Sequence, residues 1–373
     1  MNPRIIAIYL PQYHPIPEND EWWGKGFTEW RNVVKAKPRF PGHYQPHLPS
    51  DLGFYDLRVP EVRIEQAKMA RKHGIYGFCY YHYWFNGHLL LERPLEDMLI
   101  SKEPNFPFMI CWANENWTRA WDGGEKEILI EQKYNEEDDI NHIHYLMKFF
   151  KDPRYIRING KPVISIYRST LLPNIENTIE IWRTEALKEE LELYVCRFES
   201  FGEDGKDYIT KGIDAAIDFE PHTGMKEYYK FKKYANFFKR GINKVFRSII
   251  GQNILPIIED YRKYIRFQIK RIKPSYKQYP CVTPMWDNSA RRKNTFFAFH
   301  GSTPELFGIW LKNVIDKFIP YSDDENFIFI NAWNEWAEGN HLEPCIKWED
   351  RYLKEVLNIT QKLFKMEEQT KEN

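Results

Sequence analysis

The sequence has no net charge and lacks most of the motifs that assign a chain quickly to a class. Its 53 Lys and Arg balance 53 Asp and Glu, which argues against nucleic acid as the main partner. The longest apolar runs, such as IYGFCYYHYWF, fall far short of the ~20 residues that a membrane-spanning helix needs. We find no phosphate-cradling glycine loop of Walker or Rossmann type and no Ser/His/Asp signature. These absences disfavour nucleic-acid binding, a membrane span and the nucleotide-cradling folds.

Cysteine is also sparse. The five cysteines are odd in number, widely spaced and mostly inside apolar, strand-like runs, so we expect reduced core thiols in a cytosolic protein. The N-terminal run MNPRIIAIYL starts a strand at once and has no signal-peptide pattern, which favours a cytoplasmic location. His43 and His47 are four residues apart, but Pro46 opposes the helix that would align them. We therefore expect no metal and no other cofactor.

Aromatic residues, by contrast, are abundant. They make up 16% of the chain, with 13 Trp and 23 Tyr. Aromatics beyond what a core needs often line concave sites, because flat rings stack on flat ligand faces such as those of sugars. The composition alone leaves two interpretations open, an aromatic-rich core and a ligand site lined by rings.

Short β-rich runs alternate with longer helical patterns along the chain. The strand segments are residues 5–10, 76–84, 108–115, 162–167, 194–198, 215–219, 281–286 and 326–333. Helical spacing follows in residues 62–74, 140–150, 177–191 and 304–319, the last with a cap at Ser302 or Thr303. Eight strands alternating with helices are typical of parallel βα units. The pattern predicts an α/β fold, a closed (β/α)8 TIM barrel, with residues 1–373 as a single catalytic domain.

One segment departs from this pattern. Residues 226–278 carry fifteen Lys and Arg but only three Asp and Glu, interleaved with Tyr, Phe and Ile. The segment follows the sixth strand, so we expect an enlarged, basic and helical insertion within the barrel domain. It could touch an anionic glycan, or make peripheral contact with the inner face of a membrane. Alternatively, it is a solvated insertion whose charge pairs with the acidic remainder of the chain.

Aromatic, amide and carboxylate side chains gather where the predicted strands end. In a (β/α)8 barrel the active site lies at the carboxyl ends of the strands. Rings suit the apolar face of a sugar, and amides and carboxylates suit its hydroxyls. The candidate substrate-binding residues are Tyr9, Tyr13, His82, Trp84, Trp112, Asn114, Glu115, Asn116, Trp117, Arg119, Trp121, Glu220, Trp286, Asp287, Asn331, Trp333, Asn334 and Trp336. The make-up of this rim indicates a carbohydrate pocket.

The run FIFINAWNEWAEGNHLEP contains the candidate catalytic residues, Glu335 and Glu338. Glycoside chemistry uses two carboxyl groups, one protonated to assist the leaving oxygen and one ionised. Residues three apart on a strand face opposite sides, so both can reach one pocket only if the chain turns after Trp336. Gly339 makes such a turn credible. The alternative is that one glutamate pairs with Arg291, Arg292 or Arg119 and the other is solvated.

Four motifs carry a resemblance to a known family. They are LPQYHP near the start, YYHYWF at 80–85, CWANENWTRAWDG at 111–123 and NAWNEWAEGNHLEP at 331–344. In this order they resemble the WbsX-like proteins, a group labelled as glycosyltransferases of bacterial surface-polysaccharide loci. That group is similar in turn to the endo-α-mannosidases of glycoside hydrolase family 99. The resemblance covers nearly the whole chain apart from the basic segment, and implies a (β/α)8 barrel.

The resemblance also implies a retaining mechanism. The hydrolases carry a Glu-Trp-His-Glu motif, which Glu335-Trp336-Ala337-Glu338 matches at both carboxylates and at the tryptophan. Glu335 would then deprotonate the substrate's own 2-hydroxyl to give a 1,2-anhydro sugar, and Glu338 would protonate the leaving oxygen. Ala337 stands where the hydrolases have histidine. That departure leaves the hydrolases' mannose preference open for this chain.

The sequence thus supports three functions. The first is a carbohydrate-active enzyme that cleaves or transfers at a glycosidic bond of a bacterial surface polysaccharide or its precursor. The second is a sugar-nucleotide-dependent glycosyltransferase. The absence of an Asp-x-Asp motif, which would bind the metal of a nucleotide diphosphate, argues against it. The third is a non-catalytic glycan-binding protein that touches a membrane through residues 226–278. All three take an oligo- or polysaccharide as partner and none takes nucleic acid.

Overall fold

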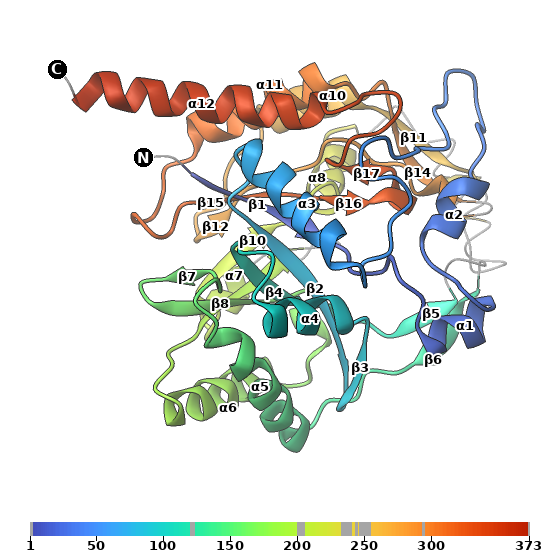
Figure 1. Ribbon diagram of the computed structural model, residues 1–373. Helices are drawn as coiled ribbons and strands as arrows, with labels where there is room; N and C mark the ends of the chain where they lie inside the picture. Colours follow the sequence, from blue (N-terminus) through green and yellow to red (C-terminus); the bar gives the residue numbers. More distant parts are fainter. Residues whose placement is uncertain are drawn as a thin grey trace.

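The chain forms a barrel of parallel strands surrounded by helices (Figure 1). The computed structural model describes residues 3–119, 124–199, 206–232, 241–242, 245, 255–292 and 295–371. Trp121 and much of the basic segment lie outside the described residues. None of the helices within these ranges is both long and apolar enough to cross a bilayer.

The barrel wall is built from strands distributed along the whole chain. They are β1 (Arg4–Tyr9), β2 (Gly77–Phe85), β4 (Phe108–Trp112), β8 (Lys161–Ile166), β9 (Tyr194–Glu199), β10 (Ala215–Asp218), β12 (Gln278–Tyr279), β13 (Cys281–Val282) and β15 (Phe327–Ile330). They pair in the order β12-β10-β9-β8-β4-β2-β1-β15-β13. Only Pro280 separates β12 from β13, so the ladder begins and ends on one segment. This arrangement confirms the predicted TIM barrel.

Helices cover the outside of the barrel. They are α3 (Pro60–Lys72), α4 (Arg93–Ser101), α5 (Glu136–Phe150), α6 (Ile175–Lys188), α7 (Lys206–Ile209), α8 (His222–Phe231), α10 (Tyr261–Gln268), α11 (Pro304–Lys317) and α12 (Arg351–Lys371). The α5 and α6 helices pack together, as do α11 and α12 (Figure 1). Thr303 caps α11, because its hydroxyl accepts a hydrogen bond from the Leu306 N–H at 3.3 Å.

Shorter elements decorate the two ends of the barrel. They are α1 (Pro17–Trp23), α2 (Trp30–Lys35), β3 (His88–Leu90), β5 (Trp117–Arg119), β6 (Gly124–Ile130), β7 (Arg157–Ile158), β11 (Ile257–Asp260), β14 (Phe297–His300), β16 (Asn334–Glu335) and β17 (Asn340–His341). The α8 helix begins before the basic segment and overlaps its start, and α10 lies within the segment. The same segment also contains β11, which pairs with β14 in a small sheet of its own.

Each predicted strand overlaps a barrel strand of the structure, but the predicted boundaries of three strands are wrong. The third predicted strand, residues 108–115, ends at Trp112, and the eighth, 326–333, leaves the sheet at Asn331. The seventh, 281–286, is the split pair β12 and β13. Pro280 has no N–H to donate to the ladder, although its carbonyl accepts from the Phe329 N–H at 2.8 Å. The barrel core is apolar, and all five cysteines are buried and unbridged, as expected.

Candidate active site

A cavity of about 300 Å³ lies at the carboxyl ends of the barrel strands. Segments that follow β1, β4, β8, β10, β13 and β15 contribute to its wall, together with β2 itself. Its lining contains both candidate catalytic glutamates, Glu335 and Glu338. The cavity therefore occupies the place where (β/α)8 enzymes carry out their chemistry.

Strand β2 forms an aromatic side of the cavity. Tyr81, Tyr83 and Phe85 line it. Successive side chains of a strand point to opposite faces, so the residues between these three face the surrounding helices. Accordingly, the Trp84 indole N–H donates to Asp138 of α5 at 2.9 Å, and His82 lies 3.0 Å from His142 of the same helix. The aromatic character of β2 serves the cavity on one face and the barrel–helix packing on the other.

The two glutamates are held by a turn at the end of the eighth barrel strand. Strands β16 and β17 pair as a short antiparallel ladder, and Trp336–Glu338 between them forms a 3-10 turn. Gly339 closes this turn with φ +53°, a backbone conformation that residues other than glycine rarely adopt. The turn expected from the sequence is thus present, and it brings both carboxylates to the lining of one cavity.

Residues from the start of the chain fix the position of this turn. The Asn334 side chain accepts from the Leu10 N–H at 2.8 Å and donates to the Leu10 carbonyl at 3.0 Å. The Tyr13 hydroxyl donates to the Asn334 carbonyl at 2.7 Å and accepts from the Trp336 N–H at 3.1 Å. Asn334 and Tyr13 therefore anchor the backbone that carries Glu335 and Glu338.

Arg291 joins the two glutamates. Its guanidinium lies 3.0 Å from the Glu335 carboxylate, 2.8 Å from that of Glu338 and 3.0 Å from that of Glu29. Glu29 and Glu335 are buried, whereas the Glu338 side chain is 21% exposed. The alternative in which one glutamate pairs with an arginine and the other is solvated does not describe this site, because a single arginine engages both.

Burial sets the protonation behaviour of this cluster. Loss of hydration raises the pKa of Glu335, the Arg291 charge lowers it, and the negative charges of Glu338 and Glu29 raise it again, with a net upward shift. Burial likewise raises the pKa of Glu29 against the lowering effect of Arg291. Carboxylates so close to one another cannot all ionise freely. The site therefore holds a carboxyl group that binds a proton more tightly than glutamate does in water.

Seven of the predicted site residues line the cavity. They are Glu335, Glu338, Glu115, Asn116, Trp117, Trp286 and Asn331. The Trp117 ring stacks on Tyr83 with ring centres 5.4 Å apart. Glu115 forms an ion pair with Arg168, and Asn116 accepts from the Gln132 N–H at 2.8 Å. These contacts hold an aromatic and polar wall of the cavity.

The structure places several other predicted residues outside the cavity lining, in the packing around the barrel. Tyr9 points towards α3 and donates to Gln66 at 2.7 Å. Trp112 packs against Trp182 with ring centres 5.7 Å apart, and Trp333 against Phe78 at 5.0 Å. These rings belong to the aromatic-rich core that composition also allowed, as do His82 and Trp84.

The remaining predicted residues support loops and turns. Asn114 bonds the Arg168 backbone in both directions, and Trp336 donates to Glu343 at 2.7 Å. Asp287 accepts from Gln45 at 2.7 Å, and Arg119 pairs with Glu127 at 2.7 Å. Glu220 is buried beside Arg271 and Tyr264, behind the cavity wall. Tyr13 and Asn334 anchor the turn that carries Glu335 and Glu338, and Trp121 lies outside the described residues.

Several lining residues were not among the predicted site residues. Among them are Gln12, Tyr81, Tyr83, Phe85, Tyr167, Phe219, His222, Asn288, Arg291 and Arg292. The alternation within β2 was the available signal for Tyr81, Tyr83 and Phe85. From the sequence, Arg291 was named only as a possible partner of one glutamate, and no local pattern marks its contact with Glu29, which is 262 residues away in the sequence.

Comparison with known proteins now assigns the chain to a family. The model of the family described as Glycosyltransferase WbsX matches residues 5–356. The chain belongs to this WbsX family. The protein WxcX of Xanthomonas campestris pv. campestris (strain B100) is 38% identical over 342 residues, which are 91% of this chain and 47% of that protein. The WbsX chain thus spans about half the length of the curated relatives it matches.

Solved structures show the same fold at low identity. A GH99 endo-alpha-mannosidase from Bacteroides thetaiotaomicron, in complex with Bis-Tris-propane, superposes with a TM-score of 0.55 at 14% identity. That match covers 97% of this chain and 98% of the other. A glycoside hydrolase-like protein gives a TM-score of 0.57 at 14% identity, covering 96% and 94% of the two chains. These likenesses show that the WbsX chain shares the barrel fold of glycoside hydrolases.

Proposed function

We propose that this chain is a carbohydrate-active enzyme that cleaves or transfers at a glycosidic bond with retention. The observation that carries the proposal is the pair Glu335 and Glu338, joined by Arg291 in an aromatic cavity at the carboxyl ends of the barrel strands. Membership of the WbsX family and the glycoside hydrolase-like barrel support an enzyme that acts on glycans. Its substrate is an oligo- or polysaccharide, namely a bacterial surface polysaccharide or its precursor.

In the first step Glu335 acts as the base. It takes the proton of the substrate's 2-hydroxyl, and the 2-oxygen attacks the anomeric carbon while the glycosidic bond breaks. Glu338 gives its proton to the leaving oxygen, so that a 1,2-anhydro sugar and a free alcohol result. Burial raises the pKa of Glu335 to about 8, so its ionised form is a stronger base than a glutamate in water and becomes populated towards higher pH. Arg291 neither gives nor takes a proton in this step, and its guanidinium holds both carboxylates in place.

In the second step the roles reverse. Glu338 removes a proton from water or an acceptor hydroxyl, whose oxygen attacks the anomeric carbon and opens the anhydro ring. The 2-oxygen takes its proton back from Glu335. Two displacements at one carbon restore the original anomeric configuration. Tyr83 and Trp117, stacked on one another at the wall, offer aromatic faces to the sugar during both steps.

The proposal includes the setting of the enzyme. The chain acts in the cytoplasm as one catalytic domain, without metal or other cofactor, and residues 226–278 contact the inner face of the membrane. The abundance of Lys and Arg with aromatic residues in that segment supports the contact.

Substitution of the two glutamates tests the chemistry. The cognate glycan is found first by screening bacterial polysaccharide repeat units with mass spectrometry of the products. Glu335→Gln and Glu338→Gln should each lower kcat about 10²–10⁴-fold on that glycan, which is the contribution of general acid–base catalysis. Glu192→Gln, which removes an exposed carboxylate paired with Lys161, serves as the control and should leave kcat unchanged. Full activity in either active-site variant would refute the assignment.

A second candidate function is transfer from a sugar nucleotide, which the family description favours. The two arginines at the cavity, Arg291 and Arg292, are the groups that could face a diphosphate. Isothermal titration with a panel of nucleotide sugars distinguishes the two functions. Tight binding that requires Mg²⁺ or Mn²⁺ would favour the sugar-nucleotide transferase over the retaining glycosidase-like enzyme.

A further inference from the structure

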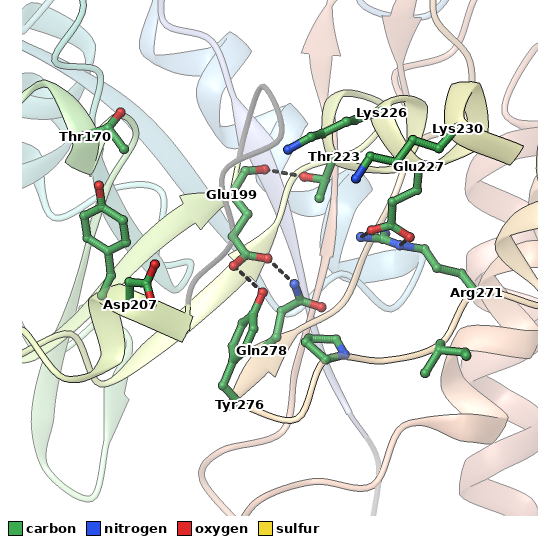
Figure 2. Close-up of a pocket in the computed structure, with 13 residues that line it drawn as sticks. Thr170, Glu199, Asp207, Thr223, Lys226, Glu227, Lys230, Arg271, Tyr276 and Gln278 are labelled. Atoms are coloured by element: carbon green, nitrogen blue, oxygen red, sulfur yellow. Dashed lines mark hydrogen bonds and ion pairs between the residues drawn. The ribbon is translucent and has the colours of Figure 1, made fainter. Parts of the chain in front are cut away.

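The structure contains a second cavity, of about 530 Å³, whose lining residues are drawn in Figure 2. It is lined by residues from the end of β9, from α7 and α8, and from the segment that leads into β12. Its lining is polar, with hydroxyl, amide, carboxylate and ammonium groups. It is larger than the cavity that contains Glu335 and Glu338.

The two cavities are neighbours along the barrel rim. The connection between β10 and α8 contributes His222 to the first cavity and the next residue, Thr223, to the second. In the same way, the loop after β8 contributes Tyr167 to the first and Thr170 to the second. A glycan that occupies the first cavity and extends past this shared wall therefore meets the second.

Three carboxylates, those of Glu199, Asp207 and Glu227, line the second cavity, and contacts within the chain engage Glu199 and Glu227. Glu199 is buried, accepts from the Tyr276 hydroxyl at 2.7 Å and bonds the Gln278 amide. Glu227 lies against the Arg271 guanidinium, with two N–O distances of 3.1 and 3.2 Å. Their charges are thus compensated by hydrogen bonds or by a cation inside the wall.

Two ammonium groups reach the cavity from α8. Lys226 and Lys230 are one helical turn apart, so both side chains leave the same face of the helix. Figure 2 shows both side chains extending from α8 towards the side where Glu199 lies. A ligand in the cavity would meet two positive charges on one side and the Thr170, Tyr276 and Gln278 polar groups around it.

We propose that the second cavity is a distal subsite for an anionic sugar, one bearing a carboxylate or a phosphate, in the same glycan that the first cavity processes. Lys226 and Lys230 bind the anionic group, and the hydroxyl and amide groups of the wall bind the sugar hydroxyls. The inference rests on the proposed function, because it identifies the substrate as an acidic glycan.

Binding without turnover tests this subsite. A Glu335→Gln background is titrated calorimetrically with tetragalacturonate, with glucose 1-phosphate and with neutral maltotetraose. We expect the acidic ligands to bind more tightly than the neutral one, and the two acidic probes distinguish a carboxylate from a phosphate preference. Adding Lys226→Gln and Lys230→Gln should weaken acidic binding about tenfold and reduce its salt dependence.

A matched control removes the same charge elsewhere in the basic segment. Lys263→Gln with Lys270→Gln, two exposed residues outside the second cavity, should leave the affinity within about twofold of the parent, as expected for exposed charges that do not touch the ligand. An equal loss in this control would overturn the subsite, because it would show a general charge effect. The subsite is also overturned if neither acidic probe binds, or if Arg292→Gln abolishes acidic binding and the lysine pair does not.

Two further outcomes separate this inference from its alternatives. Capture by phosphatidylserine vesicles that is lost in the Lys226/Lys230 variant would assign these lysines to a membrane surface and overturn the subsite. Acidic binding through the lysines, combined with full activity of Glu335→Gln, would leave the subsite standing as a glycan-binding site and refute the proposed chemistry.

Discussion

Arg291 is the residue on which the charge balance of the candidate site depends. It is buried between three carboxylates, at distances of 2.8 to 3.0 Å. The attraction within a buried ion pair offsets the free-energy cost of removing its charges from water only when every partner is present. Removing one partner leaves an uncompensated buried charge. Arg291 therefore holds both glutamates, and in the proposed mechanism it also favours the ionised form of Glu335 that acts as the base.

Replacing Arg291 should change stability and the pH profile together. Arg291→Gln should lower the free energy of unfolding by about 3–5 kcal/mol, measured by urea denaturation. The arginine lowers the pKa of Glu335, so its loss raises that pKa further. The base is active only when ionised, so the rising limb of kcat/KM against pH should move to higher pH. Arg291→Lys keeps the charge and should retain more of the original profile, and an unmoved rising limb in both variants would contradict the role assigned to Arg291.

At the residue scale, the sequence predicted the two glutamates and named Arg291 only as a possible partner of one of them. Glu335 and Glu338 stand in a motif with a local signature, whereas Arg291 meets Glu29 only through the fold. On β2, His82 and Trp84 were chosen by residue type, whereas strand alternation places both side chains against α5 and outside the cavity lining. Tyr81 and Tyr83, one position away, line the cavity.

At the scale of elements, the 3-10 turn Trp336–Glu338 decides where the carboxylates point. Gly339 closes it with φ +53°, and a Cβ at this position would lie 2.9 Å from the Asp287 Cβ. Asp287 also donates its N–H to the Glu338 carbonyl at 2.6 Å. The turn is therefore packed against the segment after β13 as well as against β1.

Gly339→Ala should impair the site more than the fold. The positive φ alone costs an L-residue roughly 1–2 kcal/mol. Gly53→Ala is the matched control for backbone strain, because Gly53 has φ +60° and no heavy atom within 4 Å of an added Cβ. Both variants should lose stability to strain, as read by thermal unfolding, and Gly339→Ala should lose more because its Cβ would lie 2.9 Å from the Asp287 Cβ. Only Gly339→Ala should also lower kcat, by about tenfold or more, as the displaced turn moves Glu338 away from its reactive geometry. Equal kcat values in the two variants would show that the turn does not position the chemistry.

The order and type of the main elements could be read from the sequence, because parallel barrel strands are long apolar runs and their helices have strong periodicity. The edges could not. The β4 strand ends at Trp112, although the predicted strand continues through residues 113–115. The split at Pro280 depends on tertiary pairing, because β12 pairs with β10 whereas β13 pairs with β15. The β11–β14 pairing is also invisible locally, since its strands lie on either side of the seventh barrel segment.

At the scale of the whole molecule, charge is distributed unevenly along a neutral chain. Part of the basic segment pairs with carboxylates elsewhere: Arg271 with Asp218 and Glu220, and Lys277 with Glu325. These pairs support the interpretation in which the segment's charge is compensated within the chain. Lys226 and Lys230 line the second cavity, which supports contact with an anionic glycan. Two of the three interpretations of the basic segment, compensation within the chain and contact with an anionic glycan, are thus supported by different residues within it.

The most direct test of the central claim is the stereochemistry of the first product. Once the screen identifies the cognate glycan, proton NMR is recorded immediately after mixing, before the released sugar mutarotates. Two successive displacements, with Glu335 and Glu338 in their proposed roles, predict a first product with the same anomeric configuration as the substrate. They also predict no reaction with a substrate whose 2-hydroxyl is replaced by hydrogen. A first product of inverted configuration, or normal turnover of the 2-deoxy substrate, would contradict the mechanism.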